Sequence, residues 1–208
     1  MEEKHFINVR KDEHEIKEFV KRTFGKGKIS RVNIEYTPVG EKIIVATHKP
    51  GLVIGKKGEK IEQLTEVLKK RFKLENPHVD IEEIITPEHD AQLIADDIAL
   101  GLERFGALRY KAICYKTLTR IQKSGALGAE IRVSGKLPSD RARSWRFAFG
   151  YLKKTGNASE IVDKAEATAE TLQGVVGVKV SILAPNTKIH DSIDVDETLN
   201  YIKAHGKE

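Results

Sequence analysis

The residues best suited to binding chemistry lie in the segment VIGKKGEKI, where two glycines enclose two lysines. Gly55 and Gly58 lack a Cβ atom, so the backbone there can lie close to a sugar-phosphate chain. Lys56 and Lys57 add positive charge at the same place, and Lys60 follows in the first turn of an expected helix. The unpaired amides that open a helix attract a phosphate. These residues predict binding to a nucleic-acid backbone.

The surroundings of this loop decide between that prediction and an ordinary tight turn. The bare Gly-x-x-Gly spacing is weak, because the chain has 16 glycines. A nucleotide-binding P-loop is excluded, since no Ser or Thr follows Lys56 or Lys57. A β-hairpin, PGLV and a following helix stand in the order of a KH domain, which favours RNA. Val53 and Ile54 are expected to line a groove for unstacked bases.

A second candidate site is a predicted helix over residues 107–123, with cations on one side and apolar residues on another. We call its cations the helical stripe: Arg109, Lys116, Arg120 and Lys123. Because no Asp or Glu occurs from Arg104 through Ala129, pairs within the helix cannot neutralise the stripe. We therefore expect it to await an outside partner.

Further cations follow on the neighbouring strands and loop: Arg132, Lys136, Arg141, Arg143 and Arg146. Residues 104–154 hold 13 Lys and Arg against two carboxylates, Glu130 and Asp140. Such a block attracts a polyanion, and arginines grip phosphates with paired hydrogen bonds. The alternative is a face neutralised by the acidic last quarter of the chain. Trp145, Phe147, Phe149 and Tyr151 alternate, which indicates core and groove residues and not a base-stacking platform.

Catalytic and metal-binding patterns are missing from the sequence. The seven histidines show no metal-ligand spacing, and Cys114 falls on an apolar helical side, where a structural thiol is expected. The adjacent pairs Glu82-Glu83 and Asp96-Asp97 have diverging side chains and are interpreted as surface charges. We predict no catalytic residue, no metal and no cofactor.

The elements that must position these sites fall into two groups. Residues 1–85 read as helix, β-hairpin, short helix, helix and strand, and residues 86–185 as two helices followed by four mostly antiparallel strands. Thr86-Pro87-Glu88 looks like the start of the first helix of the second group. Residues 186–208 are expected to form an acidic and polar tail. The fold class is α+β.

Composition narrows the class of protein. The chain has 208 residues, 39% of them hydrophobic and 32% charged, and its net charge is +5. No apolar stretch approaches the roughly 18 residues of a membrane span, and the first residues lack the apolar segment of a signal peptide. We expect a cytoplasmic protein with no membrane partner, stabilised by packing, since a lone Cys114 excludes a disulfide framework.

Several segments together resemble a known family, universal small-subunit ribosomal protein three, a KH-domain protein of the ribosomal head. The likeness spans nearly the whole chain. It rests on VIGKKGEKI, RYKAICYKTLTRIQKSGALGAEIRVSGKL and GVVGVKVSIL, and SGKLPSDRARSWRF resembles archaeal and eukaryotic members. The resemblance implies a type II KH domain (αββααβ) at 1–85 and, at 86–185, an α/β domain with two helices on a four-stranded sheet.

The same resemblance implies a non-enzymatic ribosomal component and its partners. These are small-subunit ribosomal RNA, neighbouring head proteins, and messenger RNA in the channel through which it enters. Lys111 occupies a position that is basic in the family's channel helix, whereas Ala112 and Tyr115 replace residues that are basic in bacterial relatives. The alternatives are a nucleic-acid-processing enzyme, such as an abasic-site DNA lyase, and a KH-domain RNA regulator outside the ribosome.

Overall fold

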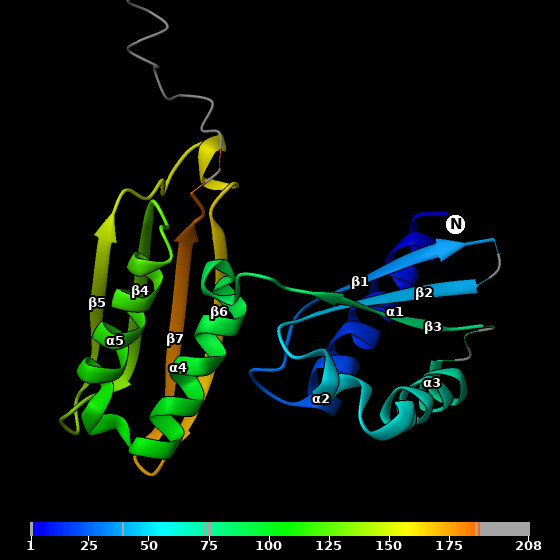
Figure 1. Ribbon diagram of the computed structural model, residues 1–208, viewed down its shortest axis with the longest axis horizontal. Helices are drawn as coiled ribbons and strands as arrows, with labels where there is room; N and C mark the ends of the chain where they lie inside the picture. The colour runs from blue at the N-terminus through cyan, green and yellow to red at the C-terminus, as the bar shows by residue number, and fades with distance from the viewer. Residues whose placement is uncertain (1, 39, 73, 75, 186, 188–208) are drawn as a thin grey trace, which may run out of the picture.

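The computed structural model contains two β-sheets, each with its own helices and its own apolar core (Figure 1). The structure describes residues 2–38, 40–72, 74, 76–185 and 187. Almost all of the predicted tail, 186–208, lies outside the described residues. The mixed α+β class predicted from the sequence is confirmed.

The N-terminal half has the predicted element order. Its elements are α1 (Glu2–Phe24), β1 (Ile29–Thr37), β2 (Gly40–Thr47), α2 (Pro50–Ile54), α3 (Glu59–Phe72) and β3 (His78–Glu83). In the sheet, β2 pairs antiparallel with β1 and parallel with β3. The helix α1 ends where Gly25 takes a φ of 79° and its N–H bonds the Lys21 carbonyl at 3.0 Å.

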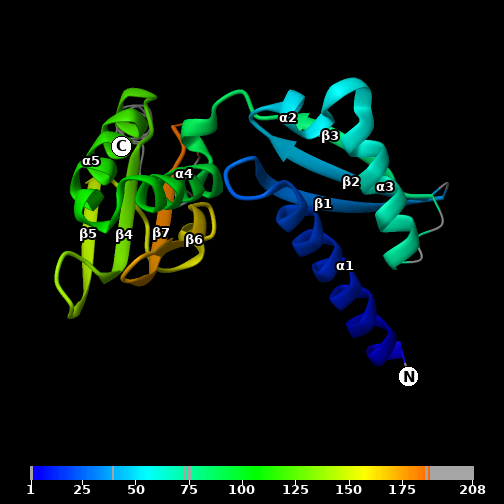
Figure 2. The same cartoon turned by 90° about the horizontal axis from the view of Figure 1, so that it is seen from below.

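The core of this half forms where helices α1 and α3 pack on the sheet. Ile16 and Val20 of α1 meet Leu64 and Leu68 of α3, all at most 3% exposed, in a cluster with sheet residues such as Ile43. The first turns of α1 extend away from this core (Figure 2), and Phe6 near that end is 61% exposed. The GKKG loop (Gly55 to Gly58), between α2 and α3, is therefore carried by a well-packed scaffold.

The C-terminal half is one sheet with helices on one side. Its elements are α4 (Ala91–Phe105), α5 (Tyr110–Lys123), β4 (Gly128–Lys136), β5 (Ala142–Gly150), β6 (Asp163–Thr171) and β7 (Gly174–Leu183). The strand order is β5-β4-β7-β6, with every pair antiparallel. Helix α4 packs on β6 and β7, and α5 packs on β4 and β5 (Figure 1).

The first helix of this half begins later than the sequence predicted. Thr86 makes no side-chain capping bond, and Pro87–His89 forms a short 3-10 turn instead. Asp90 is the true N-cap, since its carboxylate accepts the Leu93 N–H at 3.0 Å. The Thr-Pro-Glu signal was wrong by one turn because Asp90, also a strong capping residue, stands just beyond it.

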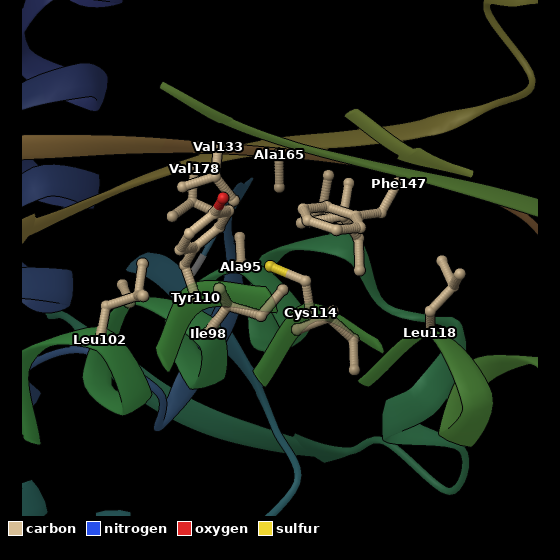
Figure 3. Packing of buried hydrophobic residues seen from close by; sticks show 14 of the residues in the cluster. Ala95, Ile98, Leu102, Tyr110, Cys114, Leu118, Val133, Phe147, Ala165 and Val178 are labelled. Carbon is tan, nitrogen blue, oxygen red and sulfur yellow. The ribbon is translucent and has the colours of Figure 1, made fainter. Parts of the chain in front are cut away.

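The core of the C-terminal half lies between the two helices and the sheet. In Figure 3, Tyr110 and Cys114 of α5 point toward Phe147 and Val133 of the strands. These four side chains are between 0% and 6% exposed. Burial raises the pKa of the Cys114 thiol to about 12, so the predicted structural thiol is protonated at neutral pH.

Polar contacts join the two halves around Asp96 of α4. Its Oδ2 accepts the Gly27 N–H at 2.8 Å, and the neighbouring Lys26 ammonium bonds both Glu103 and the Thr168 carbonyl at 2.9 Å. Asp96 is 7% exposed, and this burial raises the pKa of its carboxyl. The interpretation of Asp96 as a surface charge was wrong, because the N-terminal half covers it, whereas Asp97 is exposed.

Candidate nucleic-acid interface

The GKKG loop owes its shape to three residues with left-handed torsions. Gly55, Lys57 and Gly58 have φ angles of 74°, 54° and 86°. A Cβ on Gly55 would lie 2.8 Å from the Cγ of Lys60, so the close approach to α3 also requires glycine. The turn leads directly into α3, whose first N–H, that of Glu59, bonds the Lys56 carbonyl within the loop. The predicted loop and helix start are both present.

The loop presents its two lysines to solvent. Lys56 and Lys57 are exposed, and neither has a carboxylate within 4 Å in the part of the chain that the structure describes. Lys60 has a different role, since its ammonium bonds the Leu52 carbonyl at 3.3 Å and so ties α3 back to α2. Two solvent-exposed charges therefore stand beside a tight backbone turn, an arrangement suited to phosphate.

The apolar residues just before the loop do not all lie where the sequence predicted. Val53 is fully buried and belongs to the N-terminal core, so the expectation that it lines a groove was wrong. Leu52 and Ile54 are 46% and 37% exposed and stand at the surface next to the loop. Successive residues of a helix point about 100° apart around its axis, so Val53 can face the core while Leu52 and Ile54 reach the surface on either side of it.

The helical stripe lies along α5 and its N-terminal cap, and all four of its cations are exposed. The stripe is not wholly without internal partners, however. The Arg120 guanidinium bonds Asp97 of the neighbouring helix α4 at 2.8 Å. Among the described residues, Arg109, Lys116 and Lys123 have no carboxylate within 4 Å. Three of the four members therefore have no ion pair within the described residues, and the outside partner of the stripe stays a prediction.

Lys111 lies beside the stripe on the aromatic edge of α5. Its ammonium sits 4.9 Å from the centre of the Trp145 ring and 5.9 Å from that of Tyr110. Such cation–π contacts fix the lysine stem while leaving the charge at the surface. Ala112 and Tyr115 are exposed next to it and bring no charge.

The cations predicted on the strands and the loop between them lie in two separate places. Lys136, Arg141 and Arg143 are exposed at the β4–β5 turn. Arg132 and Arg146 lie on the sheet face opposite the helices, where both bond Glu130. The basic block therefore covers two faces of the C-terminal half. Among the described residues, Asp97 pairs with Arg120, and Glu130 pairs with Arg132, Arg146 and Lys154. The acidic segment HDSIDVDE of the last quarter lies outside the described residues.

No constellation for catalysis stands out beside these cations. Across the described ranges, no group of three His, Cys, Asp or Glu residues could hold a metal ion. The same residues include no helix with both the length and the apolar character that a membrane crossing requires. The groups of this surface that are suited to binding a partner are therefore its exposed cations.

Comparison with known proteins gives a consistent result. Residues 15–89 match the KH domain family, and residues 98–182 match the family described as Ribosomal protein S3, C-terminal domain. Small ribosomal subunit protein uS3 of Methanocaldococcus jannaschii is 40% identical over 183 residues, which cover 88% of this chain and 87% of that protein. The proteins of the same name from Halobacterium salinarum and Haloarcula marismortui are 37% and 36% identical, and this chain covers 65% of each. The resemblance found in the sequence is confirmed, and the chain belongs to the uS3 family of small ribosomal subunit proteins.

Proposed function

We propose that this chain is a structural, non-enzymatic component of the small ribosomal subunit that binds ribosomal RNA of the head and contacts neighbouring ribosomal proteins. As a ribosomal component it works in the cytoplasm. The name and extent of its relatives support this role. The observation that carries the RNA-binding part is the GKKG loop, whose exposed Lys56 and Lys57 have no carboxylate partner among the described residues.

In this proposal the loop binds the RNA backbone and not a particular base. The left-handed turn lets a phosphate approach the positive end of the α3 helix dipole, and the two lysines neutralise it. Contacts of this kind supply much of the affinity and fix position, whereas sequence is read elsewhere. The exposed Leu52 and Ile54 supply an apolar surface for unstacked bases next to the held backbone.

The helical stripe and Lys111 have a second role in this proposal, contact with messenger RNA in the channel through which it enters. Arg109, Lys116 and Lys123 are exposed and without an ion pair in the described part of the chain. Messenger RNA must slide, so contacts through charge without base recognition suit it. Because Ala112 and Tyr115 carry no charge, the proposal extends to contact and not to unwinding.

Charge reversal in the loop tests the RNA-binding part. The variant Lys56→Asp/Lys57→Asp is titrated with a transcript of the head domain of archaeal small-subunit ribosomal RNA in a filter-binding assay at fixed salt. We expect at least a tenfold loss of affinity, because repulsion replaces attraction at the phosphate. The matched control is Lys4→Asp/Lys11→Asp on the extended part of α1, which makes the same change of charge away from the loop (Figure 2). Equal losses in both variants would reduce the effect to net charge and remove the loop from the interface.

The stripe is tested by the salt dependence of binding. Neutralising Arg109, Lys116 and Lys123 to Gln is expected to flatten the slope of log affinity against log salt by roughly 0.7 for each phosphate that these cations neutralise, measured with single-stranded RNA. An unaltered slope would show that these cations do not neutralise RNA phosphates and would remove the stripe from the proposal.

A further inference from the structure

The helix-free face of the C-terminal sheet carries three cations side by side. Arg132 on β4 stands directly opposite Arg146 on β5 and, on its other side, directly opposite Lys179 on β7. All three are exposed. Like charges at directly opposed positions destabilise a sheet. Glu166 of β6 ends the row opposite Lys179, so the row holds three cations against one carboxylate, an excess of positive charge that attracts an anionic ligand.

A buried carboxylate holds Arg132 and Arg146 of this row, together with Lys154, in place from below. Glu130 is 8% exposed, and its carboxylate forms ion pairs with Arg132 at 3.3 Å, Arg146 at 3.1 Å and Lys154 at 2.5 Å. The three cationic side chains remain 50%, 55% and 49% exposed. Burial acts to raise the pKa of Glu130, but the bonds from Lys154 and Arg146 outweigh it and leave that pKa below its ordinary value. Glu130 is thus ionised and orients the cations without covering them.

The outward residues in the rows on either side are small or polar, and the apolar residues near them are Leu152 and Val162, which line a cavity. The next row across the sheet consists of small residues: Ser144, Ser134, Gly177 and Thr168. On the other side of the row, Ser181 of β7 lies between Glu130 and Lys164. A cavity of about 210 Å³ opens here, and its lining includes Glu130, Arg132, Lys154, Lys164, Lys179 and Ser181. A polyanion that reaches the cations from outside therefore meets mainly small and polar side chains beside them.

We propose that this face is a third RNA-binding surface, which holds the sugar-phosphate backbone of ribosomal RNA. We call it the outer patch: Arg132, Arg146, Lys154, Lys164 and Lys179, with Glu130 beneath them. The proposal rests on the ribosomal function proposed above and adds a surface separate from the GKKG loop and the helical stripe. Its cations face phosphates, and its serine and threonine hydroxyls face ribose oxygens.

The composition of the patch favours RNA over a protein partner. Protein interfaces depend on buried aromatic and apolar anchors at their centres. In the three rows that contain Ser134, Arg132 and Glu130, the outward residues include no large apolar side chain. Paired arginines fixed by a carboxylate present a preorganised fork for phosphate oxygens. The only carboxylate partner of Lys179 in the described part of the chain, Glu166, bonds it at 2.6 Å and is itself exposed, so RNA can displace it.

The test uses lysines of the patch that do not touch Glu130. In the full chain, Lys164→Gln/Lys179→Gln removes two charges and leaves the Glu130 cluster intact. With the head-domain ribosomal RNA transcript as probe, the slope of log affinity against log salt is expected to become shallower by roughly 1.4 to 1.8, the value for two phosphate contacts. The matched control, Lys4→Gln/Lys11→Gln, removes the same charge from α1 and is expected to leave the slope unchanged.

The outcomes separate the outer patch from the function on which it rests. An unchanged slope for the patch variant, with binding still weakened by Lys56→Asp/Lys57→Asp, would overturn the outer patch and leave the ribosomal RNA role. Unchanged binding in both variants would count against the RNA role itself. A slope that falls equally in the control would reduce the effect to net charge and overturn the patch.

Acylation of lysines distinguishes RNA from a protein occupant. Lys154, Lys164 and Lys179 are modified in the free protein, in its complex with the transcript and in purified small subunits. We expect at least threefold protection of these lysines in the transcript complex and in subunits, with Lys4 reactive in the transcript complex. Protection in subunits alone would assign the face to a neighbouring protein, and reactivity in both would leave it in solvent; either result overturns the proposal.

Discussion

The GKKG loop and the outer patch both gather cations, but they hold them by different means. In the loop the main chain does so, through left-handed backbone torsions at Gly55, Lys57 and Gly58. In the outer patch a buried side chain does so, since Glu130 bonds three cations from below. A protein can thus hold several cations close together in two ways: through backbone torsions, or through one buried carboxylate that pairs with all of them.

The GKKG loop and the outer patch should differ in how much side-chain freedom their cations lose when they bind a phosphate. Lys56 and Lys57 have long side chains and no carboxylate partner among the described residues, so each loses side-chain freedom when it meets a phosphate. Arg132, Arg146 and Lys154 are already oriented by Glu130 and lose less. Because of these ion pairs, the patch contributes to the free energy of unfolding, whereas the loop lysines contribute little to it.

The largest expected effect comes from removing the carboxylate of the patch. Glu130→Ala should lower the free energy of unfolding by about 2 kcal/mol, because three cations then face one another without a partner. The cost stays below that of a fully buried pair, since the cations are half exposed and can be hydrated. Urea unfolding measures it. A loss under about 0.5 kcal/mol would mean that Glu130 does not organise the patch.

The pH dependence of stability tests the charge of Glu130 apart from its shape. Its pKa in the fold lies below the ordinary 4.5, so its ionised form stabilises the fold above that pH. This contribution is lost as the pH falls through the lowered pKa. The stability gap between the protein and Glu130→Gln, which is smaller than that of the alanine variant, should be full at pH 7 and close on acidification. A gap that does not vary with pH would contradict the ion-pair account.

The loop should respond to a backbone change instead. Gly58→Ala places a Cβ in open space but at a φ of 86°, which costs about 1 kcal/mol for an alanine. Gly51→Ala is the matched control, because Gly51 lies in α2 with no atom near its added Cβ and no left-handed torsion. It should be neutral or stabilising by about 0.5 kcal/mol. Equal effects of the two changes in thermal unfolding would show that the torsion at Gly58 carries no cost.

The same difference explains what the sequence could predict. Gly55 to Lys60 form one local segment, so their spacing predicted both the loop and the start of α3. The row of Arg132, Arg146 and Lys179 depends on the register of three strands, which no local pattern contains.

The sequence also missed the partners of its cations. Within the basic block Glu130 is only one of two carboxylates, and no pattern singles out Lys154, Lys164 or Lys179. The period-2 alternation of the strands, in which Glu130 and Arg132 share a face opposite Ile131, was the available signal. The burial of Asp96 depends on contact between the two halves and had no local signal at all.

The smallest expected effect concerns the ion pair between Arg120 and Asp97, in which the cation is held neither by backbone torsions nor by a buried carboxylate. Both side chains are about half exposed, at 47% and 56%, so water screens their 2.8 Å contact. Asp97→Asn should change the free energy of unfolding by less than about 0.5 kcal/mol, and a double-mutant cycle with Arg120→Gln should give a coupling energy within the same limit. The variant also frees Arg120, so its binding to single-stranded RNA should strengthen slightly and become steeper in salt.

A coupling near the roughly 2 kcal/mol expected of Glu130 would break the comparison, because an exposed pair would then hold a cation as firmly as a buried carboxylate does. A weak coupling would sharpen it, since burial of the acid, and not proximity alone, would then be what fixes a cation in this protein.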